Sequence, residues 1–212
     1  LEMIGHCLIT NPEKKKALGK FFFLHGGGGN GKGTLLEIIT AILGRSNVSN
    51  VSPKQLKDER YSNALIGKLA NLADDVEDVS LDNDIMKIMK NISTCDNIQL
   101  RKLNHNAIET RVTATLINTT NHLLKSFEKG DSFRRRMLWL PMFTKVEKFD
   151  GTFITRITAP QALSYWVRLI IEAYERLWEN GEFTKSEMLN EAQTEYHRNN
   201  NNTIMFLSLI HI

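Results

Sequence analysis

The chain has 212 residues, and at about 150 residues per domain this length allows one full domain with an appendage. A composition of 42% hydrophobic and 24% charged residues, with 13 Gly and 4 Pro, excludes a fibrous or largely disordered protein. The formal net charge of +3 excludes a chain coated with basic residues, although it permits an anionic partner.

The cysteines and histidines lack the spacing of metal-binding motifs, so we expect no structural metal. Cys7 and Cys95 are too few for a disulfide framework, which favours a reducing compartment and two cysteines that fill space. No apolar run reaches the roughly 18 residues of a membrane span, and the start LEMIGHCLIT lacks the basic region of a signal peptide. We therefore expect a cytoplasmic protein without a membrane partner.

The first part of the chain predicts a helical lead-in over residues 1–19, followed by half of a parallel α/β unit. The run KFFFLH at 20–25 is typical of a buried strand, and it stops at four glycines. The segment KGTLLEIITAIL at 32–43 is apolar on nearly all sides and ends at Gly44, which predicts a crossover helix packed on a sheet.

Further strands are predicted at 47–52, 69–73, 111–121 and 137–143. Apolar residues at spacings of three and four predict a helix around 81–92, and the polar residues 95–110 predict a loop or hairpin. A helix from an N-cap at Thr158 to Gly181 and a second helix over 186–198 form the expected C-terminal helical region, 146–200. We expect the core to span 20–145, and the tail 201–212 to lead to a domain that is missing from the chain.

The strongest motif is the glycine-rich loop between the first strand and its helix. Successive backbone N–H groups of such a loop converge on phosphate oxygens, and its lysine neutralises the β and γ phosphates. A flexible glycine turn is the alternative. The loop predicts ATP as the ligand, with a P-loop NTPase core of the α/β class, a central mostly parallel sheet flanked by helices, and these nucleotide-binding residues: Gly26, Gly29, Asn30, Gly31, Lys32, Gly33 and Thr34.

An ATPase that hydrolyses with water needs acidic side chains at the end of a neighbouring strand. Asp74 and Asp75 end the predicted strand 69–73, although adjacent acids are also common in solvated turns. Gly33 replaces the hydroxyl residue that normally follows the lysine and binds Mg²⁺, and Thr34 stands one position later. We expect Asp74 and Thr34 to hold the Mg²⁺ ion.

Two further polar features follow the acid pair in the order that this chemistry requires. Asn121 ends the strand 111–121, where an amide can contact the γ-phosphate and the attacking water, although such an Asn is often a turn former. The run Arg134-Arg135-Arg136 comes next, as a solvated basic run, a nucleic-acid patch or an arginine finger for a neighbouring subunit's γ-phosphate.

Several blocks of the sequence, in this order, carry a resemblance to a known family: KFFFLHGGGGNGKGTLLEII, KLANLADDVED, IMKNISTCDNIQLRKLNHNAI, TLINTTNHLL and DSFRRRMLWLPMF. They resemble the superfamily 3 helicases of the phage, plasmid and poxvirus primase-helicase type. The resemblance implies catalytic roles for Lys32, Asp74, Asp75 and Asn121. It further implies that Arg135 and Arg136 match the family's arginine pair. Departures from the family pattern are Gly33, Cys95 where a glycine is usual, and Leu124 where a proline is common.

The same resemblance implies an AAA+-like motor that assembles as a hexamer around single-stranded or forked DNA. The third block matches a hairpin that projects into the ring channel, with Arg101, Lys102 and His105 as the DNA-binding candidates. A primase or another replication domain is the implied partner, and the location is the host cytoplasm if a phage encodes the protein.

The sequence therefore favours an ATP-dependent DNA helicase or translocase that hydrolyses ATP at subunit interfaces. One alternative is a small nucleotide kinase, because the tetrad Gly31-Lys32-Gly33-Thr34 also occurs in such enzymes. The other is a non-catalytic, nucleotide-dependent assembly module in which Gly33 reflects a loss of Mg²⁺ chemistry.

Overall fold

The computed structural model describes residues 1–77, 81–101, 107–123, 131–148 and 150–199. The strands are β1 Phe21–His25, β2 Val48–Ser49, β3 Ala70–Ala73, β4 Asn97–Arg101, β5 Ala107–Arg111, β6 Thr115–Thr120 and β7 Met137–Pro141. The α-helices are α1 Glu2–Cys7, α2 Pro12–Leu18, α3 Lys32–Leu43, α4 Glu59–Ser62, α5 Asn83–Ser93, α6 Asp131–Arg134, α7 Phe153–Ile157, α8 Pro160–Asn180 and α9 Glu187–Asn199. Short 3-10 helices span Arg45–Asn47, Gln55–Lys57 and Asn63–Leu65.

The core is a five-stranded sheet in the order β2-β3-β6-β1-β7, and every neighbouring pair of its strands is parallel. The predicted α/β class with a central parallel sheet flanked by helices is confirmed. Parallel strands all end at the same edge, so the loops after β1, β3 and β6 meet there. We call this edge the carboxyl end of the sheet and the opposite edge the amino end.

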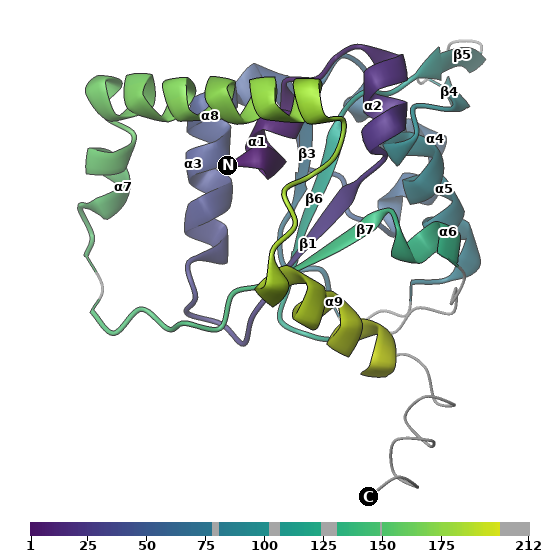
Figure 1. Ribbon diagram of the computed structural model, residues 1–212. Coiled ribbons are helices and arrows are strands. Elements are labelled where there is room, and N and C mark those ends of the chain that lie inside the picture. Colours follow the sequence, from purple (N-terminus) through teal and green to yellow (C-terminus); the bar gives the residue numbers. More distant parts are fainter. Residues whose placement is uncertain (78–80, 102–106, 124–130, 149, 200–212) are drawn as a thin grey trace, which may run out of the picture.

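Helices cover both faces of the sheet, as expected for strands with continuous apolar runs. On one face, Phe22, Leu24 and Ile39 belong to a core cluster that also includes residues of α1 and α8. On the other face, Phe21 and Phe23 pack with a second cluster drawn from α5, α6 and α9. Figure 1 shows α3 and α8 on one side of the strands and α4, α5 and α6 on the other.

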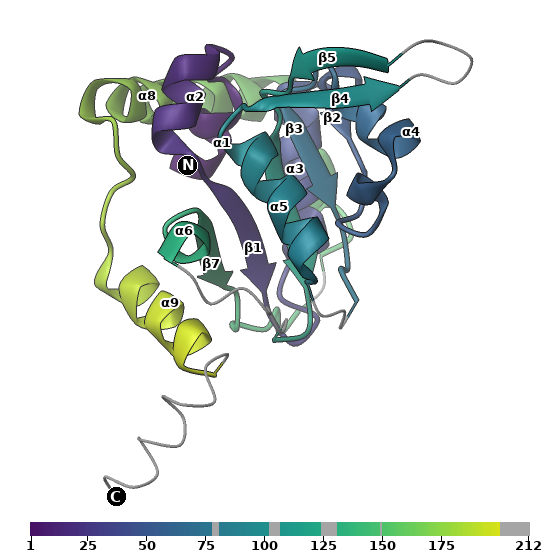
Figure 2. The ribbon, with the colours of Figure 1, turned by 90° about the vertical axis from the view of Figure 1, so that its right-hand side faces the viewer.

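The polar segment after α5 forms the antiparallel hairpin β4–β5, so the hairpin alternative predicted for 95–110 is correct. Both views show the hairpin at the amino end of the sheet (Figures 1 and 2). Arg111 belongs to β5, and β6 begins at Thr115 instead of at residue 111. In the connection between β5 and β6, Val112 and Ala114 are buried. This burial explains why the sequence pattern predicts a strand that already begins at residue 111.

The predicted N-cap at Thr158 is wrong. The sequence pattern did not indicate α7, whose C-cap is Thr158, and the Thr158 hydroxyl donates back to the Ile154 carbonyl over 2.7 Å. Ala159 is the N-cap of α8, and Pro160 takes the first helical position as expected.

Cys95, which stands where the resembled family usually has glycine, has a φ of 50°. This left-handed conformation is one that glycine adopts most readily. Cys95 and Cys7 are both free and buried, as predicted for cysteines that fill space.

α9 packs on β7, the last strand at one edge of the sheet. The Gln193 side chain pairs with the open edge of the strand in the manner of a backbone amide. Its oxygen accepts from the Trp139 N–H over 2.9 Å, and its nitrogen donates to the Met137 carbonyl over 2.9 Å. Two edge groups of β7 are thereby satisfied by a helix side chain.

A buried polar cluster joins the lead-in helices to the amino end of the sheet. Lys15 Nζ donates to the His6 carbonyl over 2.5 Å and to Thr115 Oγ1 over 2.6 Å. His6 Nδ1 lies 3.0 Å from the same hydroxyl. Burial lowers the pKa of Lys15 to about 8 and lowers the pKa of His6 well below its ordinary value.

In the described part of the chain, no helix is both long and apolar enough to cross a bilayer.

Candidate nucleotide site

The glycine loop connects β1 to α3 at the carboxyl end of the sheet, as predicted. Gly28, Gly29 and Gly31 have φ values of 92°, 65° and 80°, a region that glycine adopts without strain. At Gly26, a Cβ atom would lie only 2.1 Å from the Met142 carbonyl oxygen. Glycine is therefore required here because the chain after β7 passes against the loop.

Lys32, Asn121 and Asp75 form one hydrogen-bonded chain across three elements. Lys32 Nζ donates to the Gly26 carbonyl over 2.7 Å and to Asn121 Oδ1 over 2.8 Å. Asn121 Nδ2 in turn donates to Asp75 Oδ1 over 2.8 Å. Both Asp75 and Asn121 are exposed, whereas Lys32 is 8% exposed. The fold thus brings together the lysine, an acid and the asparagine that the sequence singled out.

Asp74 and Asp75 are held by Thr119, a β6 residue that the sequence reading did not select. The Thr119 hydroxyl donates to Asp74 Oδ1 over 2.6 Å and accepts from the Asp75 N–H over 2.8 Å. Asp75 has a φ of 45°, an uncommon backbone conformation of the kind that clusters at functional sites. Alternation in TLINTT does not distinguish Thr119 from its neighbours, so only the packing of β3 on β6 reveals it.

The candidate Mg²⁺ residues lie at the start of α3 and the end of β3. A Cβ placed on Gly33 would lie 3.9 Å from Asp74 Oδ2, so this carboxylate faces the first turn of the helix, where Thr34 also stands. Carboxylate and hydroxyl oxygens suit Mg²⁺, which usually takes its other ligands from water and phosphate. Among the described residues, no group of three or more His, Cys, Asp or Glu side chains is arranged for a metal.

Residues 142–146, which we call the strap, run along the glycine loop after β7. The Met142 N–H donates to the His25 carbonyl over 2.6 Å, and the Val146 N–H donates to the Gly29 carbonyl over 3.0 Å. Asn30 Nδ2 lies 3.4 Å from the Thr144 carbonyl. The strap therefore fixes the outer side of the loop.

Arg135 and Arg136 lie at the amino end of the sheet, away from the loop. The Phe21 N–H donates to the Arg136 carbonyl over 2.9 Å, so Arg136 flanks the start of β1, whereas the loop follows its end. Five strand residues separate these points by about 16 Å. Arg136 Nη1 donates to the Ser132 carbonyl over 2.6 Å, whereas Arg135 is exposed. The structure does not bring either arginine to the loop of the same chain.

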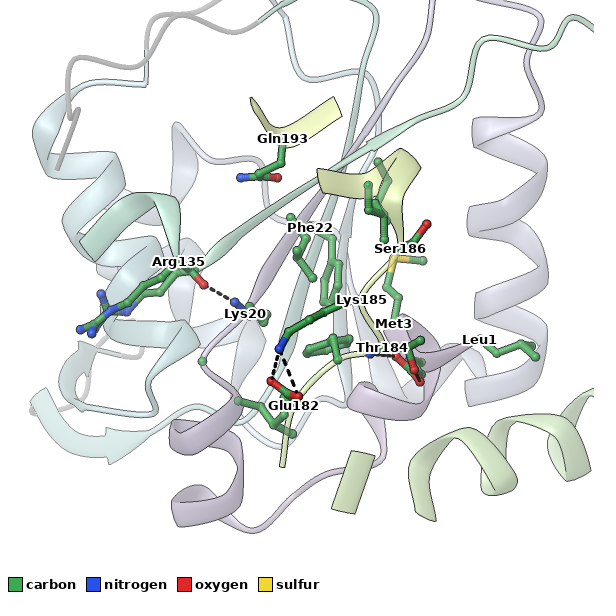
Figure 3. Close-up of a pocket in the computed structure, with 18 of the residues that line it drawn as sticks. Leu1, Met3, Lys20, Phe22, Arg135, Glu182, Thr184, Lys185, Ser186 and Gln193 are labelled. Atoms are coloured by element: carbon green, nitrogen blue, oxygen red, sulfur yellow. Dashed lines mark hydrogen bonds and ion pairs between the residues drawn. The ribbon is translucent and has the colours of Figure 1, made fainter. Parts of the chain in front are cut away.

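A cavity of about 1170 Å³ extends along β7 from Lys20 and Arg135 near the amino end to Met142, and glycine-loop residues 26–31 do not line it. Figure 3 shows Arg135 and Lys20 on one side of it, with Lys20 Nζ donating to the Arg135 carbonyl, and the Glu182–Lys185 ion pair beneath. Burial, together with the nearby Arg135 and Arg136 guanidinium groups, lowers the pKa of Lys20. The apolar side of the cavity includes Leu138 and Leu140 of β7.

Of the predicted DNA-binding residues, Lys102 and His105 lie outside the described part of the chain. Arg101 is the last residue of β4, next to the part of the hairpin that the structure does not describe. Leu124 also lies outside the described residues.

Solved structures with a similar fold include two apo structures of the NrS-1 C-terminal region. Both have a TM-score of 0.58, one at 15% identity over 90% of this chain and 44% of that one, the other at 17% over 86% and 47%. A JCV helicase structure with a bound acetamide compound has a TM-score of 0.50 at 12% identity, over 92% of this chain and 64% of that one. The chain therefore has a helicase-like fold, and it spans less than half of the NrS-1 region.

No curated protein matches the sequence. A family model described as "Family of unknown function (DUF5906)" matches residues 24–136. This match runs from the end of β1 through the glycine loop, the acid pair and Asn121 to the arginine run, which is more than half of the chain. The chain belongs to the DUF5906 family.

Proposed function

We propose that the chain is the ATP-hydrolysing motor of a DNA helicase or translocase in a phage- or plasmid-type replication protein. The observation that carries this proposal is the hydrogen-bonded chain from Lys32 through Asn121 to Asp75. It joins a phosphate-binding cation to a carboxylate suited to orient water, at the edge of the sheet where such folds bind ligands.

In this proposal the loop amides and Lys32 bind the triphosphate, and Asp75 orients the attacking water. Asn121 hydrogen-bonds to both Lys32 and Asp75, so it is suited to position the water relative to the γ-phosphate. Asp74 and Thr34 would hold Mg²⁺ together with phosphate oxygens, and the ion would supply neutralising charge there.

The arginine run supports hydrolysis between subunits. Arg135 is exposed and lies at the opposite end of the sheet from its own loop, so its guanidinium is suited to the nucleotide of a neighbouring subunit and not to its own. Such a finger stabilises transition-state charge. A ring of subunits around single-stranded or forked DNA, a hexamer in the longer protein, and a primase or other replication domain as partner rest on the resemblance to superfamily 3 helicases and on the helicase-like fold.

The test is the ATPase rate as a function of protein concentration, with and without single-stranded DNA, for the wild type, Lys32→Ala and the surface control Lys87→Ala. We expect a cooperative, DNA-stimulated rise, with Lys32→Ala slower by at least about 10²-fold because a preorganised phosphate donor is lost. An unchanged rate in Lys32→Ala would refute the phosphate role.

The competing functions give different products in the same assay. Transfer of label from ATP to a nucleoside monophosphate, instead of to water, would indicate a kinase. Tight ATP binding without turnover under any DNA condition would indicate an assembly module.

A further inference from the structure

The strap carries two apolar side chains into solvent beside the phosphate loop. Phe143 and Val146 are each 62% exposed. The backbone on either side of Phe143 is fixed to the loop region, because Met142 N donates to the His25 carbonyl and Val146 N donates to the Gly29 carbonyl. The phenyl ring is therefore held at a set place relative to the glycine loop although it is open to solvent.

Aromatic contacts with residues of the sheet also hold the Phe143 ring. Phe143 meets His25 edge to face, with ring centroids 5.3 Å apart and an interplanar angle of 87°. His25 in turn packs on Trp139 of β7 at 4.9 Å, and Trp139 stacks on Tyr196 of α9 at 4.3 Å. This series of rings anchors Phe143 to the core while part of its surface remains available to another flat ring.

The order of strands sets the direction in which a nucleotide lies along this edge. Asp74 and Asp75 follow β3 and Asn121 follows β6, and both strands lie on one side of β1. In the proposed function these residues hold Mg²⁺ and the attacking water, both of which belong at the γ-phosphate end of the nucleotide. With the γ-phosphate there and the remaining phosphates over the loop after β1, the base end points to the other side of β1, where β7 and the strap lie. Figure 1 shows the chain after β7 passing the lower end of α3, next to the loop.

We propose that Phe143 is the platform on which the base of the bound nucleoside triphosphate stacks, with Val146 as an apolar neighbour. This inference rests on the proposed function of the glycine loop. Stacking on an aromatic face tolerates any base with a π-face, so the site would accept both adenine and guanine nucleotides.

The test measures dissociation constants, with Mg²⁺ present, for ATP and for inorganic tripolyphosphate, which has no base. We expect Phe143→Ala to weaken ATP binding by about tenfold or more, as loss of one stacked aromatic does, and to leave tripolyphosphate binding unchanged. Phe143→Trp should retain ATP affinity. Tyr165→Ala, at an aromatic residue of α8 that is 58% exposed, is the matched control and should change neither value.

Any other result contradicts the proposal that the base stacks on Phe143. If the wild type binds tripolyphosphate as tightly as ATP, or if Phe143→Ala binds ATP normally, the base does not stack on this ring, while the phosphate loop stands. An equal loss of both ligands in Phe143→Ala would mean that the ring only shapes the loop. If the wild type binds neither ligand, the proposed function fails together with the platform.

Discussion

The carboxyl end of the sheet joins a cation, an amide and an acid in one hydrogen-bonded chain, whereas two lysines near the amino end bond to backbone carbonyls and a hydroxyl. At the carboxyl end Lys32 reaches Asn121, which reaches Asp75. At the amino end Lys15 is enclosed among a carbonyl and a hydroxyl, and Lys20 lies near the two arginines. The first arrangement is a site within one chain. At the amino end Lys15 is buried, and the exposed Arg135 is the cation open to an anion from another subunit.

The variant Arg135→Ala should distinguish the roles of the two ends of the sheet most clearly. We expect ATP binding to remain while hydrolysis falls by about 10³- to 10⁵-fold, the usual effect of losing an arginine finger. Arg168→Ala, on the exposed side of α8, is the control. Mixed oligomers of Arg135→Ala and Lys32→Ala subunits should regain some activity. Failure of every mixture to hydrolyse ATP would contradict a role across subunits.

The buried cation at the amino end can be tested through the pH dependence of stability. The pKa of Lys15 is lowered to about 8 from its ordinary value of 10.5, so between these values the unfolded chain binds a proton that the folded chain lacks. The contribution of Lys15 to stability therefore rises with pH across this window, by up to about 3 kcal/mol.

Lys15→Met provides the reference for that measurement. Denaturant unfolding of both proteins from pH 7 to 10.5 should show the wild type gaining stability relative to the variant. Because burial also raises the pKa of Cys95, to about 11, the thiol opposes this trend, and the difference between the two proteins isolates the lysine. A constant difference across the window would contradict the lowered pKa.

The smallest expected effect concerns Thr119 at the carboxyl end. Thr119→Val removes the donor to Asp74 and the acceptor for the Asp75 N–H, so we expect ATP hydrolysis to fall about tenfold and stability to fall by about 1–3 kcal/mol. Thr119→Ser retains the hydroxyl and should keep most of the rate. If Thr119→Val keeps the rate while Thr119→Ser loses it, the methyl packing and not the hydrogen bonds holds the acids.

The sequence predicted the local part of this arrangement well. The strand, glycine loop and helix around Lys32 are contiguous, so their pattern is visible within about 25 residues, and parallel pairing then brings the ends of β3 and β6 beside the loop. Thr119, the strap and the burial of Lys15 were not predictable in the same way. Each depends on which elements pack together across long sequence separations, and no local periodicity encodes that.

α9 is a further case in which the sequence predicts an element but not its packing. Its pattern predicted a helix, but not that the helix would contact β7. Gln193 occupies two hydrogen-bonding groups on the open edge of β7, and an uncovered edge strand with apolar side chains is a template for pairing between molecules. A form of the chain shortened to Asn180 would bare this edge together with the Trp139 ring. Any recombinant version meant to stay dispersed in solution should therefore retain the sequence through Asn199, independently of whether α9 has any part in nucleotide chemistry.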